Sequence, residues 1–391
     1  MKEAVIVSAA RTPLGSFGGS LSSIGATDLG GMVIKEAVRR AGIEGGDVDE
    51  CVMGMVLPCG YGQNPGKQAV IKADLPQAVS GLTVNKVCGS GLKAVMLAAQ
   101  AIRCGDAEVV VAGGMENMSR APYYMEKARW GMRMGPGKIE DHMVHDGLWD
   151  VVNDFHMGMS NELISEKWGI TREDQDRLAA ESYRRALLAI ENGRFVDEIM
   201  PVPVAAKKGE TRMFSVDECA KPTSYEALAK MKPAFKKDGV GTAGNASSIS
   251  DGAAALVLME KKKALAMGCR IMAEIGAQAS AGIELRHVLM APAMAIPKAL
   301  EKQGITTKDV DLFEINEAFA GSSFGVNKVL ELDIEKVCVN GGGIALGHPI
   351  GASGARVLIT LLYEMQRRDA KTGVASLCLG GGEAVAIVVQ R

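Results

Sequence analysis

The chain has 391 residues and a formal net charge of -2, with 47 glycines, 22 methionines and 8 cysteines. This length predicts two or three domains, and the balanced charge excludes the basic surface of a nucleic-acid-binding protein. Since no apolar stretch reaches the ~18 residues of a membrane span, we expect neither nucleic acid nor membrane as a partner. The cysteines lack Cys-x-x-Cys and metal-ligand spacing, which predicts free thiols, no metal site and a cytoplasmic location.

The first third of the chain alternates short β-branched runs with amphipathic segments. Apolar residues in 92–103 recur at helical spacing, so one side of this helix should face a core. Such alternation predicts a mostly parallel sheet covered by helices. The expected elements are strands at 5–7, 50–56 and 108–112 and helices at 29–40 and 92–103.

A different pattern follows from about residue 120 to residue 244. A helical stretch is expected over 160–192, followed by a basic, proline-containing loop over 207–237. A long excursion without strand alternation is typical of a lid or a binding loop. The strand pattern resumes at 253–258, which we assign to the first module.

The last third repeats the first in a weaker form. Three short segments recur in the same order, at separations between 262 and 268 residues, which indicates a duplicated βαβ-rich module; chance similarity of glycine-rich turns is the alternative. The pairs are Asp47-Val-Asp49 with Asp309-Val-Asp311, Gly89-Ser-Gly91 with Ala352-Ser-Gly354, and Val110–Gly114 with Leu379–Gly382. The predicted organisation is an N-terminal module of 1–119 with 245–268, a loop domain of 120–244 and a C-terminal module of 269–391.

Cys88 lies at the start of a predicted helix. It ends an extended run, 82–87, and is followed by Gly89-Ser-Gly91. The unpaired N–H groups and the dipole of a helix N-terminus stabilise a thiolate, so Cys88 is a candidate nucleophile. A small buried hydrophobic residue is the alternative interpretation.

His348 and Cys378 are candidates for proton transfer. His348 lies in the glycine-rich segment 340–354, where Pro349 fixes the backbone after the ring. Imidazole accepts a thiol proton near neutral pH, although a structural histidine bonded to backbone is the alternative. Cys378 follows a strand-like run and precedes glycines; its thiol, with an ordinary pKa of ~8.5, is suited to removing an α-proton. A buried strand cysteine gives the same pattern.

Three further segments could bind a ligand. Asn316, after the expected strand 310–315, either caps the next helix or anchors a water that stabilises an oxyanion. The loop Asn245–Ser248 would hydrogen-bond a ligand with amide groups. The basic loop would attract a phosphorylated ligand, although a solvated surface is the commoner meaning of such a run. Its basic residues are Lys207, Lys208, Arg212, Lys221, Lys230, Lys232, Lys236 and Lys237.

Taken in order, these motifs resemble those of the thiolase family. They are Ala4–Pro13, Val87–Gly91, Thr242–Ser247, Asn316–Ala320, Gly347–Gly354 and Cys378–Gly382, and they span almost the full chain. The resemblance implies an α/β thiolase fold, in which two βαβαβαββ modules form five αβαβα layers with a loop domain over the site. It also implies a reversible Claisen condensation of two acetyl-CoA molecules to acetoacetyl-CoA and CoA through an acyl-cysteine. Coenzyme A would be substrate and product rather than a bound cofactor, and the chain would form a homo-oligomer, either a dimer or a tetramer.

The family's roles can be carried over position by position. Cys88 would be the acylated nucleophile, His348 its activator and Cys378 the acid/base. Asn316, with a water and His348, would stabilise one oxyanion, and the N–H groups of Cys88 and Gly380 the other. Contacts to coenzyme A or the acyl group are implied for Leu148, His156, Met157, Lys221, Phe235, Ala243, Ser247, Ala318 and Phe319.

The motifs indicate the reaction class more firmly than the length of the substrate. In short-chain thiolases a His-Met pair like His156-Met157 lines the acyl pocket, so the resemblance favours a short-chain enzyme. A degradative 3-ketoacyl-CoA thiolase of broader chain length is the alternative. Met290–Pro297 and Glu383-Ala384 depart from the family pattern and could reshape that pocket. Cys378 argues against the ketoacyl synthases of the same fold, and the complete catalytic set argues against a non-catalytic CoA- or lipid-binding relative.

Overall fold

A ten-stranded mixed sheet runs through the protein, for which the computed structural model describes residues 2–206 and 209–391. Lys207 and Lys208 of the basic loop lie outside the described residues. The N-terminal half of the sheet contains β1 (Ala4–Arg11), β2 (Gly15–Ser16), β3 (Glu50–Gly54), β4 (Ser80–Val84), β5 (Val109–Asn117) and β12 (Ser250–Glu260). The C-terminal half contains β13 (Ala273–Gly282), β14 (Leu312–Ile315), β15 (Thr372–Leu379) and β16 (Glu383–Gln390).

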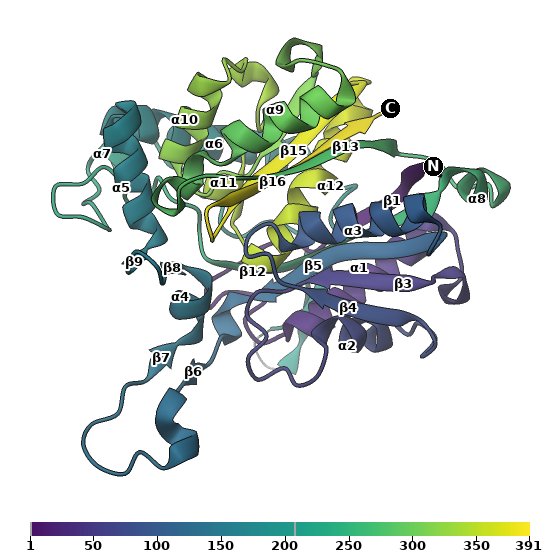
Figure 1. The fold of residues 1–391 in the computed structure, drawn as a ribbon, viewed down its shortest axis with the longest axis horizontal. Coiled ribbons are helices and arrows are strands. Elements are labelled where there is room, and N and C mark those ends of the chain that lie inside the picture. Colours follow the sequence, from purple (N-terminus) through teal and green to yellow (C-terminus); the bar gives the residue numbers. More distant parts are fainter. Residues whose placement is uncertain (1, 207–208) are drawn as a thin grey trace.

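The two halves of the sheet have the same strand order. The order β4-β3-β5-β12-β1 matches β14-β15-β16-β13, and in the place that corresponds to β4, Val337 forms a single parallel bridge with Phe313. This correspondence supports the duplication inferred from the sequence. Among the described residues, strands of the two halves pair only where Val5 and Ile6 of β1 meet β13. The halves lie as two layers, with the yellow and green C-terminal half above the other (Figure 1). The module boundaries at 119, 244 and 268 stay predictions.

The directions of the strands differ from the expectation. β3 is parallel to β4 and β5, and β14 is parallel to β15, but β12 and β16 run antiparallel to their neighbours. β16 has to reverse direction because it follows β15 directly across the glycine turn 380–382. The prediction of a mostly parallel sheet is therefore wrong, and the sheet is mixed.

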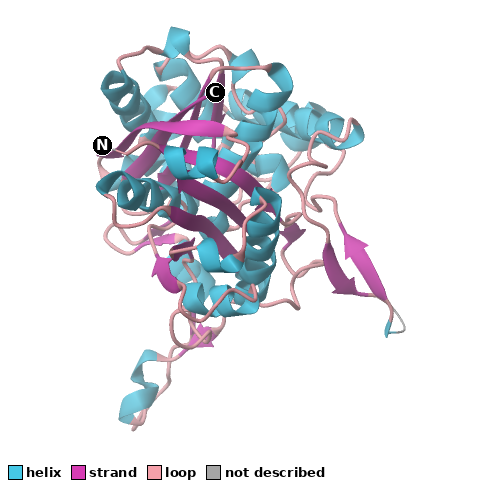
Figure 2. Ribbon diagram, turned by 90° about the vertical axis from the view of Figure 1, so that its right-hand side faces the viewer, coloured by secondary structure: helices cyan, strands magenta, loops and turns pink. Residues whose placement is uncertain are grey.

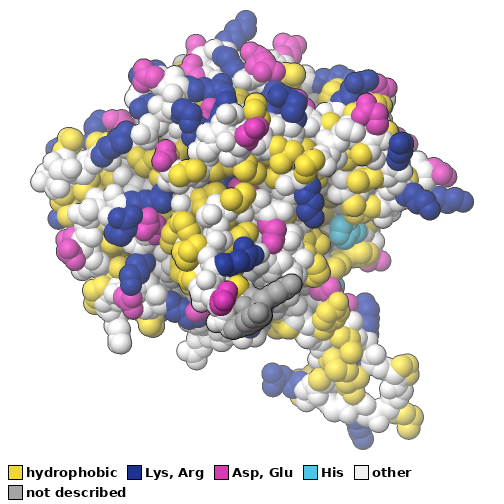
Figure 3. All heavy atoms as spheres, turned by 180° about the vertical axis from the view of Figure 1, so that it is seen from behind, with side chains coloured by type: hydrophobic (Ala, Val, Ile, Leu, Met, Phe, Trp, Pro, Cys, Tyr) yellow, Lys and Arg dark blue, Asp and Glu magenta, His cyan; other side chains and the backbone are white. Residues whose placement is uncertain are grey.

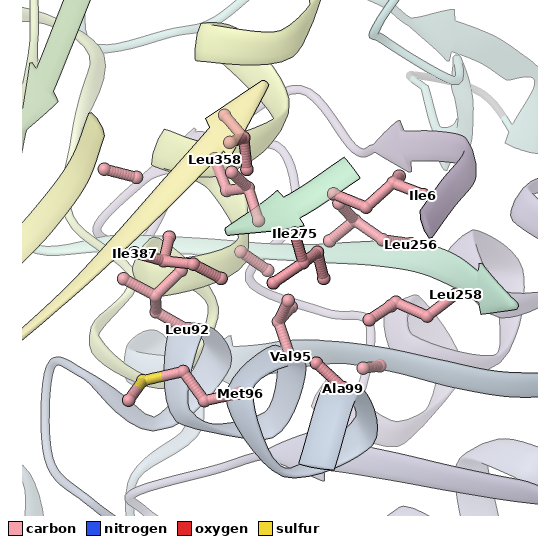
Figure 4. Close-up of a cluster of buried hydrophobic side chains, with 14 of the residues drawn as sticks. Ile6, Leu92, Val95, Met96, Ala99, Leu256, Leu258, Ile275, Leu358 and Ile387 are labelled. Carbon is pink, nitrogen blue, oxygen red and sulfur yellow. The ribbon is translucent and has the colours of Figure 1, made fainter. Parts of the chain in front are cut away.

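Helices lie in three layers around the two halves. The central layer contains α3 (Ser90–Cys104) and α12 (Ile350–Arg368); α1 (Ala26–Ala41) and α2 (Pro65–Lys72) cover the outer N-terminal face, and α9 (Pro292–Gln303) and α10 (Ala320–Val329) the outer C-terminal face. One cluster of buried apolar side chains surrounds the central helices between the two halves of the sheet, and one further cluster lies under each outer helix layer. In the central one, Leu92 and Val95 of α3 lie beside Ile387 and Ile275 of the C-terminal half (Figure 4). The five-layer thiolase fold is thereby confirmed.

The two central helices touch each other at glycines. A Cβ on Gly91 would lie 2.7 Å from the backbone nitrogen of Ala355, and a Cβ on Gly354 would lie 2.2 Å from that of Leu92. Only glycine permits so close an approach. The first turns of α3 and α12 therefore lie side by side, and the loops in front of them carry Cys88 and His348.

The middle segment contains more structure than the sequence indicated. The expected helix over 160–192 is two helices, α5 (Met157–Trp168) and α6 (Arg172–Glu191), because Gly169 ends α5 with a φ of 60° and Thr171 caps α6. The other elements are β6 (Tyr123–Tyr124), β7 (Glu140–Asp141), α4 (His142–Gly147), β8 (Trp149–Asp150), β9 (Phe155–His156), β10 (Val202–Ala205), β11 (Thr211–Phe214) and α7 (Tyr225–Ala229). An arm formed by residues 123–141 and the β10–β11 hairpin leave the body (Figure 2). In the described residues, no helix combines the length and apolarity needed to cross a bilayer.

Candidate active site

Cys88 lies in a strained loop in front of α3. The residue before it, Val87, has a φ of 47°, a left-handed conformation that β-branched residues rarely adopt. Ser90 holds this loop, because its Oγ donates to the carbonyl of Val87 at 2.6 Å and accepts from the N–H of Lys86 at 2.9 Å. Cys88 is left half-buried, on the wall of a cavity.

The surroundings of the Cys88 sulfur favour the neutral thiol in the resting protein. Burial raises the pKa of this thiol to about 12, and the neighbouring Cys378 adds to the rise. The N–H groups of Gly380 and of Cys88 itself act on the same sulfur and offset part of it. Two N–H donors that converge beside a nucleophile can also hold the oxyanion of an acyl group attached to it.

His348 is buried in the loop in front of α12. Its Nδ1 lies 2.6 Å from Oγ of Ser353, and that hydroxyl donates to the carbonyl of Pro349 at 2.9 Å. Because a hydroxyl has one proton to donate, Nδ1 carries the ring proton and Nε2 is left as an acceptor. Burial lowers the pKa of His348 to about 3, with a further contribution from Arg356. The ring is therefore a neutral base.

Asn316 lies directly behind the imidazole. Its Nδ2 is 3.4 Å from both ring nitrogens of His348, and its buried Oδ1 has no hydrogen-bond partner among the described residues. The capping alternative is wrong, because α10 begins only at Ala320 with Phe319 as its N-cap. An unpaired buried acceptor is unfavourable, so this geometry favours Asn316 as an anchor for water.

Cys378 lies near the end of β15, buried against the same cavity. Burial raises the pKa of its thiol to about 11, while the hydroxyl of Ser322 and the N–H of Cys378 partly offset the rise. At neutral pH the site therefore holds two thiols and one neutral imidazole. These shifts favour a proton transfer that accompanies bond formation over a preformed thiolate.

A single cavity of about 720 Å³ brings the predicted residues together. A volume in this range suits a small-molecule ligand. Of the predicted catalytic residues, Asn316 alone is not on the lining and lies one layer behind. The predicted residues on the lining are Cys88, His348, Cys378, Gly380, Leu148, His156, Met157, Lys221, Phe235, Ala243, Ser247, Ala318 and Phe319. Among residues 2–206 and 209–391, no cluster of three metal-ligating side chains is present.

Aromatic rings form one wall of this cavity. The ring of His156 stacks on Phe235 with centroids 5.3 Å apart, and Phe235 meets Phe319 edge-on at 5.7 Å. Nδ1 of His156 accepts the N–H of Gly158 at 3.0 Å and thus caps α5, while burial lowers the pKa of the ring. The wall is therefore uncharged. His156 is fixed by the start of α5, and Phe235 is packed between His156 and Phe319.

The loop Asn245–Ser248 and the basic loop reach the cavity through only some of their residues. The side-chain amide of Asn245 is buried and donates to Asp176 and to the carbonyl of Val240, so it holds the loop rather than a ligand. Ser247 and Ser248 of the same loop do line the cavity. Of the described basic side chains of the basic loop, Lys221 alone reaches the lining. The attraction of a phosphorylated ligand by the basic loop stays a prediction.

The two departures from the family pattern lie outside the cavity. Met290–Pro297 leads into α9, and the lining there is formed by Val288 and Leu289 instead. Glu383 forms an ion pair with Lys86, which is two residues before Cys88. Neither departure narrows or widens the cavity directly.

Sequence reasoning missed two residues that position the site. Ser353 orients the ring of His348, and a hydroxyl five residues after a histidine in a glycine-rich loop was the available signal. The buried carboxylate of Glu116 accepts the N–H groups of Val56, Leu57 and Gly351 and so ties β5 to the start of α12. Burial raises the pKa of Glu116 to about 7. A carboxylate at the end of a buried strand was its signal.

Comparison with known proteins agrees with this geometry. The sequence matches the family descriptions "Thiolase, N-terminal domain" over residues 4–262 and "Thiolase, C-terminal domain" over residues 269–391. Proteins named acetyl-CoA acetyltransferase from Pseudomonas aeruginosa and Escherichia coli are 56% and 54% identical, over 100% of both chains in each case. The crystal structure of the Bacillus anthracis acetyl-CoA acetyltransferase matches with a TM-score of 0.97 at 43% identity, covering 100% of this chain and 99% of that one. The chain therefore belongs to the thiolase family.

Proposed function

We propose that this chain is an acetyl-CoA acetyltransferase, which joins two acetyl-CoA molecules into acetoacetyl-CoA and free CoA and also catalyses the reverse cleavage. The observation that carries this proposal is the convergence of two thiols, one imidazole and two N–H groups on a single cavity. The relatives of that name at 54% and 56% identity support the substrate class. Coenzyme A enters and leaves as substrate and product, and no permanently bound cofactor takes part.

The first half-reaction loads an acetyl group onto Cys88. The thiol proton passes to Nε2 of His348 while the sulfur attacks the thioester carbonyl, and the N–H groups of Cys88 and Gly380 hold the oxyanion. The bond between the acetyl carbon and the CoA sulfur then breaks, and Cys378 gives its proton to the departing sulfur. The products are acetyl-Cys88, free CoA, an imidazolium at His348 and a thiolate at Cys378.

The second half-reaction forms the carbon-carbon bond. The thiolate of Cys378 removes an α-proton from a second acetyl-CoA, and the enolate oxygen is held by Nε2–H of His348 and a water on Asn316. The enolate carbon attacks the acetyl carbonyl, and the bond to the sulfur of Cys88 breaks. That sulfur takes back the proton from His348. Every group returns to its resting state, so a turnover exchanges no net proton with solvent.

The aromatic wall favours a short acyl group. Phe235 packs against both His156 and Phe319, and Met157 lies on the same lining. An added methylene has to displace a packed side chain, and overpacking costs ~1–3 kcal/mol. Acetoacetyl-CoA is therefore the preferred substrate for cleavage.

A chain-length series tests this proposal. Cleavage by free CoA is followed as loss of the enolate absorbance for acetoacetyl-CoA, 3-ketohexanoyl-CoA and 3-ketodecanoyl-CoA. We expect kcat/KM to fall at least ~10-fold from the first substrate to the second. Met157→Ala should reduce this difference, whereas Met159→Ala, on α5 but off the lining, should preserve it. A flat or rising profile would assign the chain to the degradative class, and no turnover at all would indicate a non-catalytic CoA-binding protein.

The arm supports association with further copies of the chain. Tyr123, Trp130 and Met134 are 66%, 79% and 97% exposed, and hydrophobic side chains gather on the arm (Figure 3). Exposed apolar patches of this kind mark interfaces, so we assign the arm to a homo-oligomer, either a dimer or a tetramer. Light scattering after size exclusion measures the mass, and a monomer would contradict the assignment.

The eight free cysteines fit a cytoplasmic location.

A further inference from the structure

A second cavity of about 610 Å³ lies behind the active site, between α6, α10 and the short 3-10 helix Ile334–Lys336. Ile315 and Glu317 line this second cavity, whereas Ala318 and Phe319 line the first, so the same short segment separates the two. Within the described residues the two linings share no member. The volume is again in the range of ligand sites, roughly 300–1,000 Å³.

The second cavity has an apolar wall with one buried carboxylate in it. Ile315, Val337 and Cys338 are buried on the lining, and Glu317 is only 5% exposed. One carboxylate oxygen, Oε2, accepts the hydroxyl of Ser182 at 2.6 Å and the N–H of Ile344 at 3.4 Å. The other oxygen, Oε1, accepts no hydrogen bond from any residue that the structure describes.

A carboxylate with one free oxygen on a largely apolar wall favours a ligand with a cationic hydrogen-bond donor. Burial raises the pKa of Glu317. The bonds from Ser182 and Ile344 and the charges of Arg356 and Arg185 offset only part of the rise. Burying a charge is unfavourable unless it is paired and hydrogen-bonded. An ammonium group supplies both the opposite charge and the missing donor, in a charge-assisted hydrogen bond. A carboxylate ligand would instead add a like charge.

The mouth of the second cavity does not repel a cation. Its two arginines are already neutralised: Arg177 pairs with Glu173, and Arg185 pairs with Glu181 and Glu335. Apart from the buried Glu317, the lining carries equal numbers of acidic and basic side chains. The acidic ones are Asp174, Glu181 and Glu331, and the basic ones are Arg177, Arg185 and Lys328.

We propose that the second cavity binds a small organic amine, whose ammonium group donates to Oε1 of Glu317 and whose apolar body lies against Ile315, Phe324 and Val337. This site is additional to the acyl-transfer site and does not depend on the function proposed above. Its ligand class is set by three features together: a largely apolar wall, one unshared carboxylate oxygen and a mouth whose three acidic and three basic side chains balance.

Isothermal titration with three six-carbon probes tests the proposal. The full-length protein, with its active site saturated by CoA, is titrated with hexylamine, 1-hexanol and sodium hexanoate, which share one alkyl chain. We expect hexylamine to bind with a Kd of roughly 1 mM or lower, 1-hexanol at least ~10-fold more weakly, and hexanoate not at all. Equal binding of the three probes, or no binding of hexylamine, would overturn the proposal.

Two variants locate the binding. Glu317→Gln keeps an oxygen for Ser182 and Ile344 but removes the charge, so hexylamine should bind at least ~10-fold more weakly. Glu331→Gln, at the exposed mouth, is the matched control and should change the affinity less than ~2-fold. Ser323→Leu adds bulk to the lining and should abolish binding even where Glu317→Gln unfolds. Unchanged hexylamine affinity in either Glu317→Gln or Ser323→Leu would place the amine elsewhere.

Discussion

The two halves of the molecule use the same helix start for different purposes. Ser90 and Ser353 occupy corresponding places in the first turns of α3 and α12, and each hydroxyl donates to a carbonyl of the loop in front, Val87 in one case and Pro349 in the other. They accept from different groups, however. Ser90 accepts a backbone N–H, from Lys86, whereas Ser353 accepts the ring of His348. Ser90 therefore holds the conformation of a backbone loop, and Ser353 determines which ring nitrogen of His348 carries the proton.

The corresponding strand ends differ in the same way. At the end of β5, the carboxylate of Glu116 accepts three backbone N–H groups and so has a structural role. At the end of β15, Cys378 and Gly380 face the cavity. The two halves thus supply corresponding positions. In the proposed mechanism the N-terminal half provides the nucleophile, and the C-terminal half provides the base and the second thiol. Neither half holds a complete site.

Removing the thiol of the N-terminal half should have the largest effect. For Cys88→Ser we expect cleavage of acetoacetyl-CoA to fall by ~10⁴ or more, because one imidazole cannot ionise a serine hydroxyl of far higher pKa. Steady-state assays measure the loss. Cys104→Ser, an exposed thiol at the other end of α3, is the control and should keep full activity. A similar loss of activity in both variants would show that the loss does not come from removal of the nucleophile.

Removing the second thiol should separate the half-reactions. In Cys378→Ala the acetyl group should still load onto Cys88, since His348 accepts that proton and the CoA thiolate can leave without Cys378. Exchange of the α-proton, followed in deuterated water, should fall by ~10² or more. Condensation at the normal rate in this variant would assign the α-proton transfer to a different group.

The two corresponding serines should fail in opposite ways. Ser353→Ala leaves Nδ1 of His348 without its acceptor and should lower kcat ~10-fold with little change in Tm. Ser90→Ala removes the anchor of the strained loop at Val87 and should cost about 1 kcal/mol of folding free energy. Thermal unfolding and steady-state kinetics on both variants make the comparison. Identical profiles would mean that Ser353 only supports the fold.

Changing the remote lysine should affect binding alone. Lys221→Ala should raise KM for CoA substrates a few-fold and weaken the salt dependence of kcat/KM while kcat stays constant, because a contact far from the reacting atoms stabilises ground and transition states alike. Lys230→Ala, which is off the lining, is the matched control. Equal KM values for parent and Lys221→Ala at low and high salt would show that this lysine is only a solvated charge.

The smallest expected effect is that of pH on acetyl loading. The pKa of His348 is lowered to about 3, and the pKa values of Cys88 and Cys378 are raised to about 12 and about 11. None of the three groups changes its charge in the neutral range, so the rate of Cys88 acetylation should be flat from about pH 5 to about pH 9. Rapid-quench kinetics measure it. A bell-shaped dependence of the acetylation rate on pH, rising and falling near neutral pH, would indicate a preformed thiolate and imidazolium instead.

The chain sequence specifies the reacting side chains better than their surroundings. Cys88, His348 and Cys378 stand in local patterns of helix starts and glycine turns, so each could be picked out before any contact was known. Gly169 and the cap at Thr171 were also sufficient to divide the helix predicted over 160–192, and that signal was overlooked.

Other features depend on contacts between distant segments and could not be predicted locally. Asn245 has the pattern of a ligand loop, yet Asp176 on α6 takes its amide. Glu116 acts on residues up to 235 positions away in the chain. The antiparallel course of β12 depends on how the middle segment returns to the sheet, for which the sequence has no periodic signal.

Acetylation of Cys88 is the step on which all the assigned roles depend. Peptide mass spectrometry after a brief incubation with acetyl-CoA identifies the modified residue among the eight cysteines. We expect one acetyl group, on the peptide that contains Cys88, and its loss when free CoA is added back, since loading is reversible. An acetyl group on Cys378 or on any other cysteine, or no adduct on a protein that still turns over acetoacetyl-CoA, would contradict the mechanism.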